Sequence, residues 1–101
     1  MNTENISRIE ILDGGELILI LESGGNASYQ HIYREAAEVY WDKELKGFKS
    51  PKPRQWSYLE KYLHIVKVAE NCSILLSLSP STEFQNILKN IKDEILASTN
   101  T

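Results

Sequence analysis

Five consecutive aliphatic residues, Leu17–Leu21, constrain the fold more than any other part of the chain. Glycine-containing segments flank this run, Asp13–Gly15 before it and Ser23–Asn26 after it. A short apolar run between turn signals is typical of a β-strand, and a continuous run is typical of a strand that is buried on both faces. We therefore predict a central strand over Glu16–Glu22, with a helix on one face and a helix or a second subunit on the other.

The residues before this strand predict its hairpin partner. Arg8–Leu12 alternates polar and apolar side chains, which is the period of a half-buried strand. The dipeptide Asp13-Gly14 favours a type I′ turn, because both central positions of that turn need a positive φ. We expect an antiparallel hairpin here, preceded by a polar, frayed segment over residues 1–6.

Other stretches also have strand patterns. Ala27–Arg34 alternates, with Tyr29, His31 and Tyr33 on one face, and predicts a third strand antiparallel to the second. The remaining strand-like segments, of which the first two would form a hairpin, are Val39–Asp42, Phe48–Ser50 and Ser73–Ser79.

Two helices are predicted from capping signals. Ser57–Glu60 fits a capping box with Ser57 as the N-cap, and the helix that follows has apolar side chains on two sides. Thr82–Gln85 fits a second capping box, ahead of an amphipathic helix over about Glu83–Leu96. The order β-β-β-(ββ)-α-β-α predicts an α+β fold, with a mostly antiparallel sheet of about four to six strands packed with two α-helices.

Length and charge limit the class of protein. The chain has 101 residues, which predicts a single domain over residues 1–101 with a frayed tail at 98–101. Cys72 is the single cysteine, so no internal disulfide can form, and a structural thiol is favoured over a nucleophile. No apolar run approaches the roughly 20 residues that span a bilayer, and no leader pattern is present. We expect a cytoplasmic protein that does not bind membranes, and the net charge of −3 disfavours nucleic-acid binding.

Aromatic side chains concentrate in Tyr40–Val66, which holds both tryptophans. Each aromatic residue buries about 150–250 Å², so these residues dominate cores and interfaces. Six aromatic residues within Tyr40–Tyr62 exceed what one small core face accommodates, so some should lie at a pocket or a subunit interface. The candidate ligand- or interface-binding residues are Arg34, Tyr40, Trp41, Trp56, Tyr58, Tyr62 and His64.

The segment Asp42–Arg54 is basic, with five cations against two carboxylates and thus a net charge of +3. Its cations could contact an acidic protein partner or a nucleic acid, with nearby aromatic rings as stacking platforms. They could equally be the solvated lysines that protect a sheet edge from aggregation. We favour the second interpretation and keep an acidic partner at Lys43–Arg54 as an open possibility.

His64 follows Glu60 by one helical turn, and such a pair could bind a metal or exchange protons. The second histidine, His31, is distant in the sequence, and no ligand spacing supports a metal site. We therefore predict no metal, no cofactor and no catalytic residue, and interpret His64 as a hydrogen-bonded histidine at the helix surface or the core edge.

Several short strings carry a resemblance to a known family. They are Tyr33–Trp41, Gly47–Phe48, Trp56–Tyr58, His64–Val66 and Leu78–Glu83. From about Ile9 to Phe84 the chain resembles a family of small bacterial proteins carried on integron gene cassettes. The resemblance implies a compact, oligomeric α+β protein from a mobile gene pool. It implies no activity and no site residues.

Two functions fit these observations. The leading one is a non-enzymatic binding or interaction protein that acts as a homo-oligomer, as the doubly apolar strand, the two-sided helix and the aromatic surplus indicate. The alternative is a small-molecule-binding protein or small enzyme, with an aromatic pocket around Trp41, Trp56, Tyr62 and His64. Whether the protein is an enzyme stays open at this level.

Overall fold

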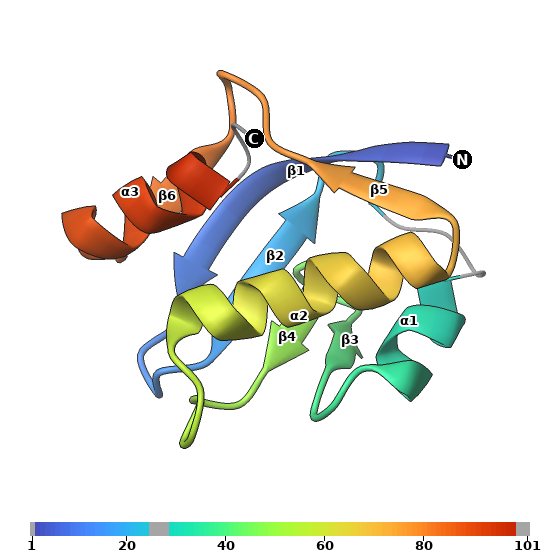
Figure 1. Ribbon diagram of the computed structural model, residues 1–101, viewed down its shortest axis with the longest axis horizontal. Coiled ribbons are helices and arrows are strands. Elements are labelled where there is room, and N and C mark those ends of the chain that lie inside the picture. Colours follow the sequence, from blue (N-terminus) through green and yellow to red (C-terminus); the bar gives the residue numbers. More distant parts are fainter. Residues whose placement is uncertain (1, 25–28, 99–101) are drawn as a thin grey trace.

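The computed structural model describes residues 2–24 and 29–98. One six-stranded sheet runs through the molecule, and the longest helix crosses one of its faces (Figure 1). The strands are β1 (Asn2–Ile11), β2 (Leu17–Leu21), β3 (Tyr40–Asp42), β4 (Gly47–Ser50), β5 (Ile74–Ser77) and β6 (Glu83–Gln85). The helices are α1 (Gln30–Glu35), α2 (Tyr58–Asn71) and α3 (Lys89–Ser98). The predicted α+β class is confirmed, although the described residues form three helices where two were predicted.

The strands follow the order β3-β4-β2-β1-β5 across the sheet. The pairs β1–β2, β2–β4 and β3–β4 are antiparallel, and the predicted second hairpin is therefore present as β3 and β4. β1 also has two parallel partners, β5 along its first half and β6 along its second half. The sheet is therefore mixed. The pairs among β1, β2, β3 and β4 are antiparallel, and the pairs of β1 with β5 and β6 are parallel.

The core lies between α2 and the sheet. Tyr62, Ile65 and Ala69 are buried on the inner side of α2 and belong to one apolar cluster with residues of β1, β2 and β4 such as Ile9 and Phe48. None of the three helices in the described residues combines the length and the apolar composition that crossing a membrane requires.

The capping box that was predicted for α2 is present. Ser57 Oγ accepts a hydrogen bond from the Glu60 backbone N–H at 3.1 Å, and Glu60 Oε1 accepts one from the Ser57 N–H at 3.0 Å. These two bonds satisfy N–H groups that the first turn of a helix leaves without a backbone partner. The start of α2, and with it the position of Trp56, is thereby fixed.

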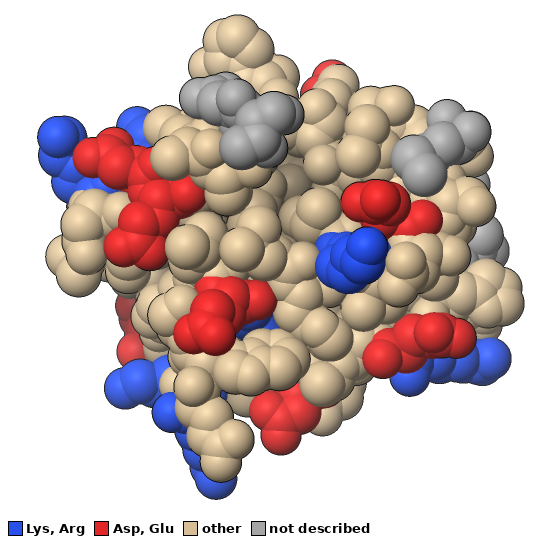
Figure 2. All heavy atoms as spheres, in the orientation of Figure 1, with Lys and Arg blue, Asp and Glu red and all other residues tan. Residues whose placement is uncertain are grey.

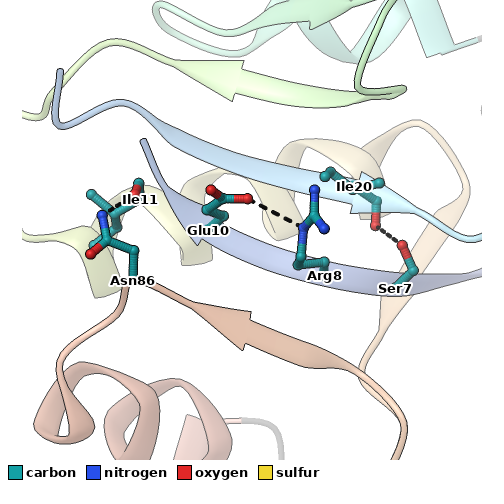
Figure 3. Close-up of polar contacts among 6 residues, drawn as sticks. All are labelled: Ser7, Arg8, Glu10, Ile11, Ile20 and Asn86. Atoms are coloured by element: carbon teal, nitrogen blue, oxygen red, sulfur yellow. Dashed lines mark hydrogen bonds and ion pairs between the residues drawn. The ribbon is translucent and has the colours of Figure 1, made fainter. Parts of the chain in front are cut away.

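Strand β2 is buried on both faces, as predicted. Ile18 is fully buried but does not belong to the cluster under α2, because it points to the other side of the sheet. Its register partners are Glu10 on β1 and Lys49 on β4. On this face Arg8 and Glu10 lie side by side, joined by an ion pair of 3.3 Å (Figure 3). Glu10 and Lys49 thus flank Ile18 from the strands on either side.

The predicted third strand over Ala27–Arg34 is wrong, since the described part of it forms the helix α1. The alternating pattern put Tyr29 and His31 on the same face of a strand, but Tyr29 is buried and His31 is exposed. The buried side chains are Tyr29, Ile32 and Ala36, which follow one another at helical spacing. Residues 27 and 28 lie outside the described residues.

The predicted helix over Glu83–Leu96 is wrong in its first half. Glu83–Gln85 is the strand β6, and α3 begins at Lys89. Thr82 does not cap a helix, because its Oγ1 donates to the Ile6 carbonyl and accepts from the Ser79 N–H. Asn86 then takes a positive φ of 54° and donates its side-chain amide to the Ile11 carbonyl (Figure 3), which ends the strand.

The ends of the chain also differ from the prediction. Residues 2–6 are not frayed, because Asn2–Asn5 pairs with β5 and both Glu4 and Ile6 are buried. Backbone pairing thus orders a segment whose polar side chains suggested a tail. Ser98 belongs to α3, while the other positions of the predicted tails, residue 1 and residues 99–101, lie outside the described residues.

The turn between β1 and β2 is not the predicted type I′ turn. The Gly15 N–H donates to the Leu12 carbonyl, and of the two glycines Gly15 has a positive φ, of 87°. The Leu12 N–H donates back to the Glu16 carbonyl. This is the three-residue hairpin loop with a glycine bulge, which joins antiparallel strands as effectively as a two-residue turn.

Candidate functional site

A hollow of about 360 Å³ lies beside the start of α2. Three parts of the chain meet there: the connection between α1 and β3, the segment that leads from β4 into α2, and the first turn of α2 itself. The residues that line the hollow are Ala37, Glu38, Pro53, Arg54, Gln55, Trp56 and Lys61.

Trp56 forms the aromatic wall of this hollow. Its side chain is 39% exposed, although α2 holds it from two directions. The His64 ring lies 4.8 Å from the Trp56 ring between centroids, and Lys61 Nζ lies 5.0 Å from the indole centroid. An ammonium group at this distance is attracted to the negative face of the indole. Two residues of α2 thus contact the ring, while Trp56 stays partly accessible.

Ala37 is tied to α2 at both of its backbone polar groups. Its N–H donates to His64 Nε2 at 2.9 Å, and its carbonyl accepts a hydrogen bond from Lys61 Nζ. His64 must be neutral at Nε2 to accept this bond. Burial and the nearby Lys61 charge both lower the pKa of His64, which favours that neutral form. His64 is therefore a hydrogen-bonded histidine, as the sequence favoured.

Lys61 is an unusual member of the wall because it is only 4% exposed. Burial lowers the pKa of its ammonium group, and the carboxylate of Glu38 opposes this shift. Glu38 itself has a backbone φ of 53°, a conformation that non-glycine residues adopt at a cost of about 1–3 kcal/mol. The turn that carries Glu38 is thus held in a strained conformation by its attachment to α2.

Trp41 lies in a different place from Trp56. Its ring packs edge-on against Phe48, with 5.1 Å between centroids, and against Tyr29, with 6.3 Å. Trp41 also lines a second hollow of about 430 Å³, together with Tyr40, which is 60% exposed. The two hollows share no lining residue, so the structure places the two tryptophans at separate sites.

The other predicted site residues are distributed over the fold. Tyr62 lies in the core at 1% exposure, and burial raises its pKa to about 12. Tyr58 donates its hydroxyl to the Gly15 carbonyl at 2.8 Å and so connects α2 to the first hairpin. Arg34 is exposed on α1 and lines neither hollow. Of the predicted set, only Trp56 and His64 are in contact near the first hollow.

Two charged residues of this site, Glu38 and Lys61, were not predicted from the sequence, and Arg54 was named only as part of the basic segment Lys43–Arg54. Lys61 had a visible signal, because it falls on the helical stripe formed by Tyr58, Ile65 and Val68. A lysine at that spacing should either end the stripe or direct its ammonium group to a partner at the edge of the core. Glu38 had no such signal, and the sequence could not show that Arg54 lies at the same hollow, since only the fold brings their segments together.

The basic segment Lys43–Arg54 does not form one surface. Lys49 makes an ion pair with Asp42 at 3.7 Å, while Lys46 lies against Gly24 and Lys52 against Gly15. In Figure 2 positive atoms gather at the lower left, and elsewhere on that face both signs are interspersed. The possibility of an acidic partner at this segment stays a prediction. In residues 2–24 and 29–98, no group of three potential metal-binding side chains occurs.

Comparisons with known proteins give the family. Residues 5–83 match the family described as Integron Cassette Protein Hfx_Cass5. A solved structure described as "Structure from the mobile metagenome of North West Arm Sewage Outfall: Integron Cassette Protein Hfx_Cass5" is 30% identical, with a TM-score of 0.43. The comparison covers 100% of this chain and 99% of that one. No curated protein matches the chain. The protein therefore belongs to the Hfx_Cass5 family of integron cassette proteins.

Proposed function

We propose that this cassette protein binds a small molecule without transforming it, and that Trp56 is the main contact surface. The hollow beside Trp56 has a volume of about 360 Å³, within the range of roughly 300–1,000 Å³ that is usual for ligand sites. It combines one large aromatic ring with a few polar groups, which is the composition of such sites. The observation that carries the proposal is the fixed position of Trp56 between His64, Lys61 and the start of α2.

The lining residues favour binding over chemistry. In the described residues, the hollow is lined by no serine, threonine, cysteine, histidine or tyrosine. Its one amine, that of Lys61, donates a hydrogen bond to Ala37 and lies over the Trp56 ring. Both interactions hold the nitrogen in place as a structural cation. A preorganised wall of this kind lowers the entropy cost of binding.

A pair of single-tryptophan variants tests the proposal. The chain has two tryptophans, so Trp41→Phe leaves Trp56 as the reporter and Trp56→Phe leaves Trp41. We expect a compound from a metabolite panel to change the emission of Trp41→Phe and to raise its melting temperature. The same compound should bind Trp56→Phe more weakly and leave its emission unchanged. If no compound binds, or if the response comes from Trp41 alone, the proposal is wrong.

Self-association is a second candidate, and the exposed edge of the sheet supports it. β3 is the last strand on its side of the sheet and carries Tyr40 at 60% exposure. An edge strand presents unpaired backbone groups that can pair with another chain. Antiparallel pairing of β3 with β3 of a second copy would set Tyr40 opposite Asp42 of the partner if Trp41 lay on the twofold axis.

Sedimentation at micromolar concentration tests this second candidate. We expect the wild-type chain to sediment as a dimer and Tyr40→Lys to sediment as a monomer. Leu88→Lys is the matched control, because Leu88 is 69% exposed but lies beyond β6, on the other side of the sheet order. A wild-type monomer at all concentrations would contradict self-association, as would a dimer that Tyr40→Lys leaves intact.

A further inference from the structure

Two exposed side chains of opposite charge line the hollow beside Trp56, and within the part of the chain that the structure describes neither forms an ion pair at contact distance. Arg54 and Glu38 both line the hollow. Among the described residues, neither forms an ion pair with the other or with a third side chain. From this arrangement we infer that the ligand is a small zwitterion of the α-amino acid class. The inference rests on the proposed function and specifies it.

Each charge suits one end of such a ligand. The guanidinium group of Arg54 presents a planar set of donors that matches a carboxylate, and bidentate bonds of this type are among the strongest in proteins. The carboxylate of Glu38 can accept hydrogen bonds from a ligand ammonium group. A ligand with only one of these charges would leave the other protein charge partly desolvated and unpaired, which costs binding energy.

Lys61 does not upset this balance. Its charge would give the lining residues a net charge of +1, with Arg54 and Lys61 positive and Glu38 negative. Its ammonium group is, however, bonded to the Ala37 carbonyl and lies over the Trp56 ring. Lys61 also interacts electrostatically with Glu38, but its own contacts hold it in the wall of the hollow. Arg54 and Glu38 are exposed and are therefore the groups that can reach a ligand.

The position of Glu38 is fixed in the way that a binding residue requires. The preceding residue, Ala37, is bonded to α2 through both its N–H and its carbonyl. Glu38 follows with its φ of 53°. Strained backbone conformations of this kind cluster at ligand-binding sites, where the surrounding contacts maintain them. The backbone at Glu38, a residue that lines the hollow, is thereby held by α2.

The remaining lining residues suit an apolar side chain of modest size. Pro53 and Ala37 present aliphatic surface, and Trp56 presents its indole ring. About 360 Å³ is near the lower limit for ligand sites, which favours small ligands. The hollow thus fits a free amino acid better than a long peptide.

The test uses Trp41→Phe as the fluorescent background and free amino acids as probes. The panel is the natural L-amino acids other than tryptophan and tyrosine, each compared with its amide, which lacks the carboxylate, and its N-acetyl derivative, which lacks the ammonium group. We expect at least one amino acid to bind. Its two derivatives should bind about tenfold more weakly or worse, since a charge-assisted hydrogen bond is worth about 1.5–3 kcal/mol.

Charge-neutralising variants locate the two contacts. Arg54→Gln and Glu38→Gln should each weaken amino acid binding about tenfold. Glu38→Gln should also reduce the preference for the amino acid over its N-acetyl derivative, because the group that recognises the ammonium is gone. Lys43→Gln and Glu44→Gln change the net charge identically at exposed positions outside the hollow, and should leave binding unchanged.

The possible failures are distinguishable. Derivatives that bind as tightly as the amino acid would overturn the zwitterion, while the proposed binding function would stand. The same holds if a compound without an amino or carboxylate group binds at Trp56 and no amino acid does. If nothing binds at Trp56, both the inference and the proposed function are wrong.

Discussion

Tyr29 donates its hydroxyl to Glu4 Oε2 at 2.7 Å, and both residues are only 8% exposed. The second carboxylate oxygen of Glu4 accepts the backbone N–H of Ser23 at 3.2 Å. One buried carboxylate on β1 thus connects the residue before α1 with the turn after β2. A polar residue at the start of the chain becomes a point of attachment for two other segments.

Removing this hydroxyl should destabilise the fold. Tyr29→Phe keeps the ring contacts with Trp41 and Phe48 but leaves Glu4 Oε2 buried without its donor. We expect the free energy of unfolding to fall by about 1–3 kcal/mol, measured by urea denaturation. Glu4→Gln can accept the Ser23 N–H on its carbonyl oxygen and donate its amide N–H to the Tyr29 oxygen, so it should cost less. Equal stability of Tyr29→Phe and the wild type would show that the bond contributes nothing.

The protein should lose stability in alkaline solution through its buried tyrosines. Burial raises the pKa of both Tyr29 and Tyr62 to about 12, and Glu4 adds to the shift of Tyr29. Since the unfolded chain loses these protons near pH 10, the folded state binds more protons between pH 10 and 12, and stability falls as pH rises through this window. Unfolding curves across that range should show a smaller fall for Tyr62→Phe than for the wild type. An identical fall in the variant would contradict the assignment.

Protonation of His64 should make the protein less stable at acidic pH. Burial and Lys61 lower the pKa of His64 below its ordinary value of 6.5, so on acidification the unfolded state takes up this proton first. The free energy of unfolding should therefore decrease as pH falls below about 6.5, and level off below the folded-state pKa. His64→Gln should flatten this dependence, whereas His31→Gln, at an exposed position, should not. Denaturation curves at several pH values distinguish these outcomes.

Gly47 should tolerate no side chain. A Cβ atom at this position would lie 2.3 Å from the Leu19 carbonyl oxygen and 2.9 Å from Ile20 Cα, both in the backbone of the neighbouring strand. We expect Gly47→Ala to cost about 1–3 kcal/mol or more in thermal or urea unfolding. Gly14→Ala is the control, because the atoms nearest to its Cβ would be those of the flexible Glu16 carboxylate. A smaller loss for Gly47→Ala than for Gly14→Ala would be inconsistent with this packing.

The sequence predicted correctly those helices and strands that are determined by contacts between residues close together in the chain. The capping box Ser57–Glu60 identified the start of α2 correctly, because both of its bonds lie within four residues. The hairpin of β3 and β4 was predicted for a similar reason, since its strands are near neighbours in the chain. The aliphatic run Leu17–Leu21 predicted a strand buried on both faces, and the structure confirms it.

The errors arose where a distant segment decides the conformation. Glu83–Gln85 had a helical pattern but pairs with Arg8–Glu10, and the Thr82 hydroxyl bonds to Ile6 rather than capping a helix. The candidate site shows the same limit. His64 and Trp56 could be proposed from their neighbourhood in the sequence, whereas Glu38 reaches the hollow only through contacts between the turn at Ala37 and α2.

The double parallel pairing of β1 has a consequence for the order of events during folding. β1 comes from the start of the chain, but its partners on one side are Ile74–Ser77 and Glu83–Gln85. During synthesis on the ribosome, one edge of β1 therefore stays unpaired until β5 and β6 have been made. Contacts between such distant segments form slowly, and an unpaired edge is open to aggregation in the meantime. We therefore expect the yield of folded protein in cells to depend on chaperones or on the rate of translation.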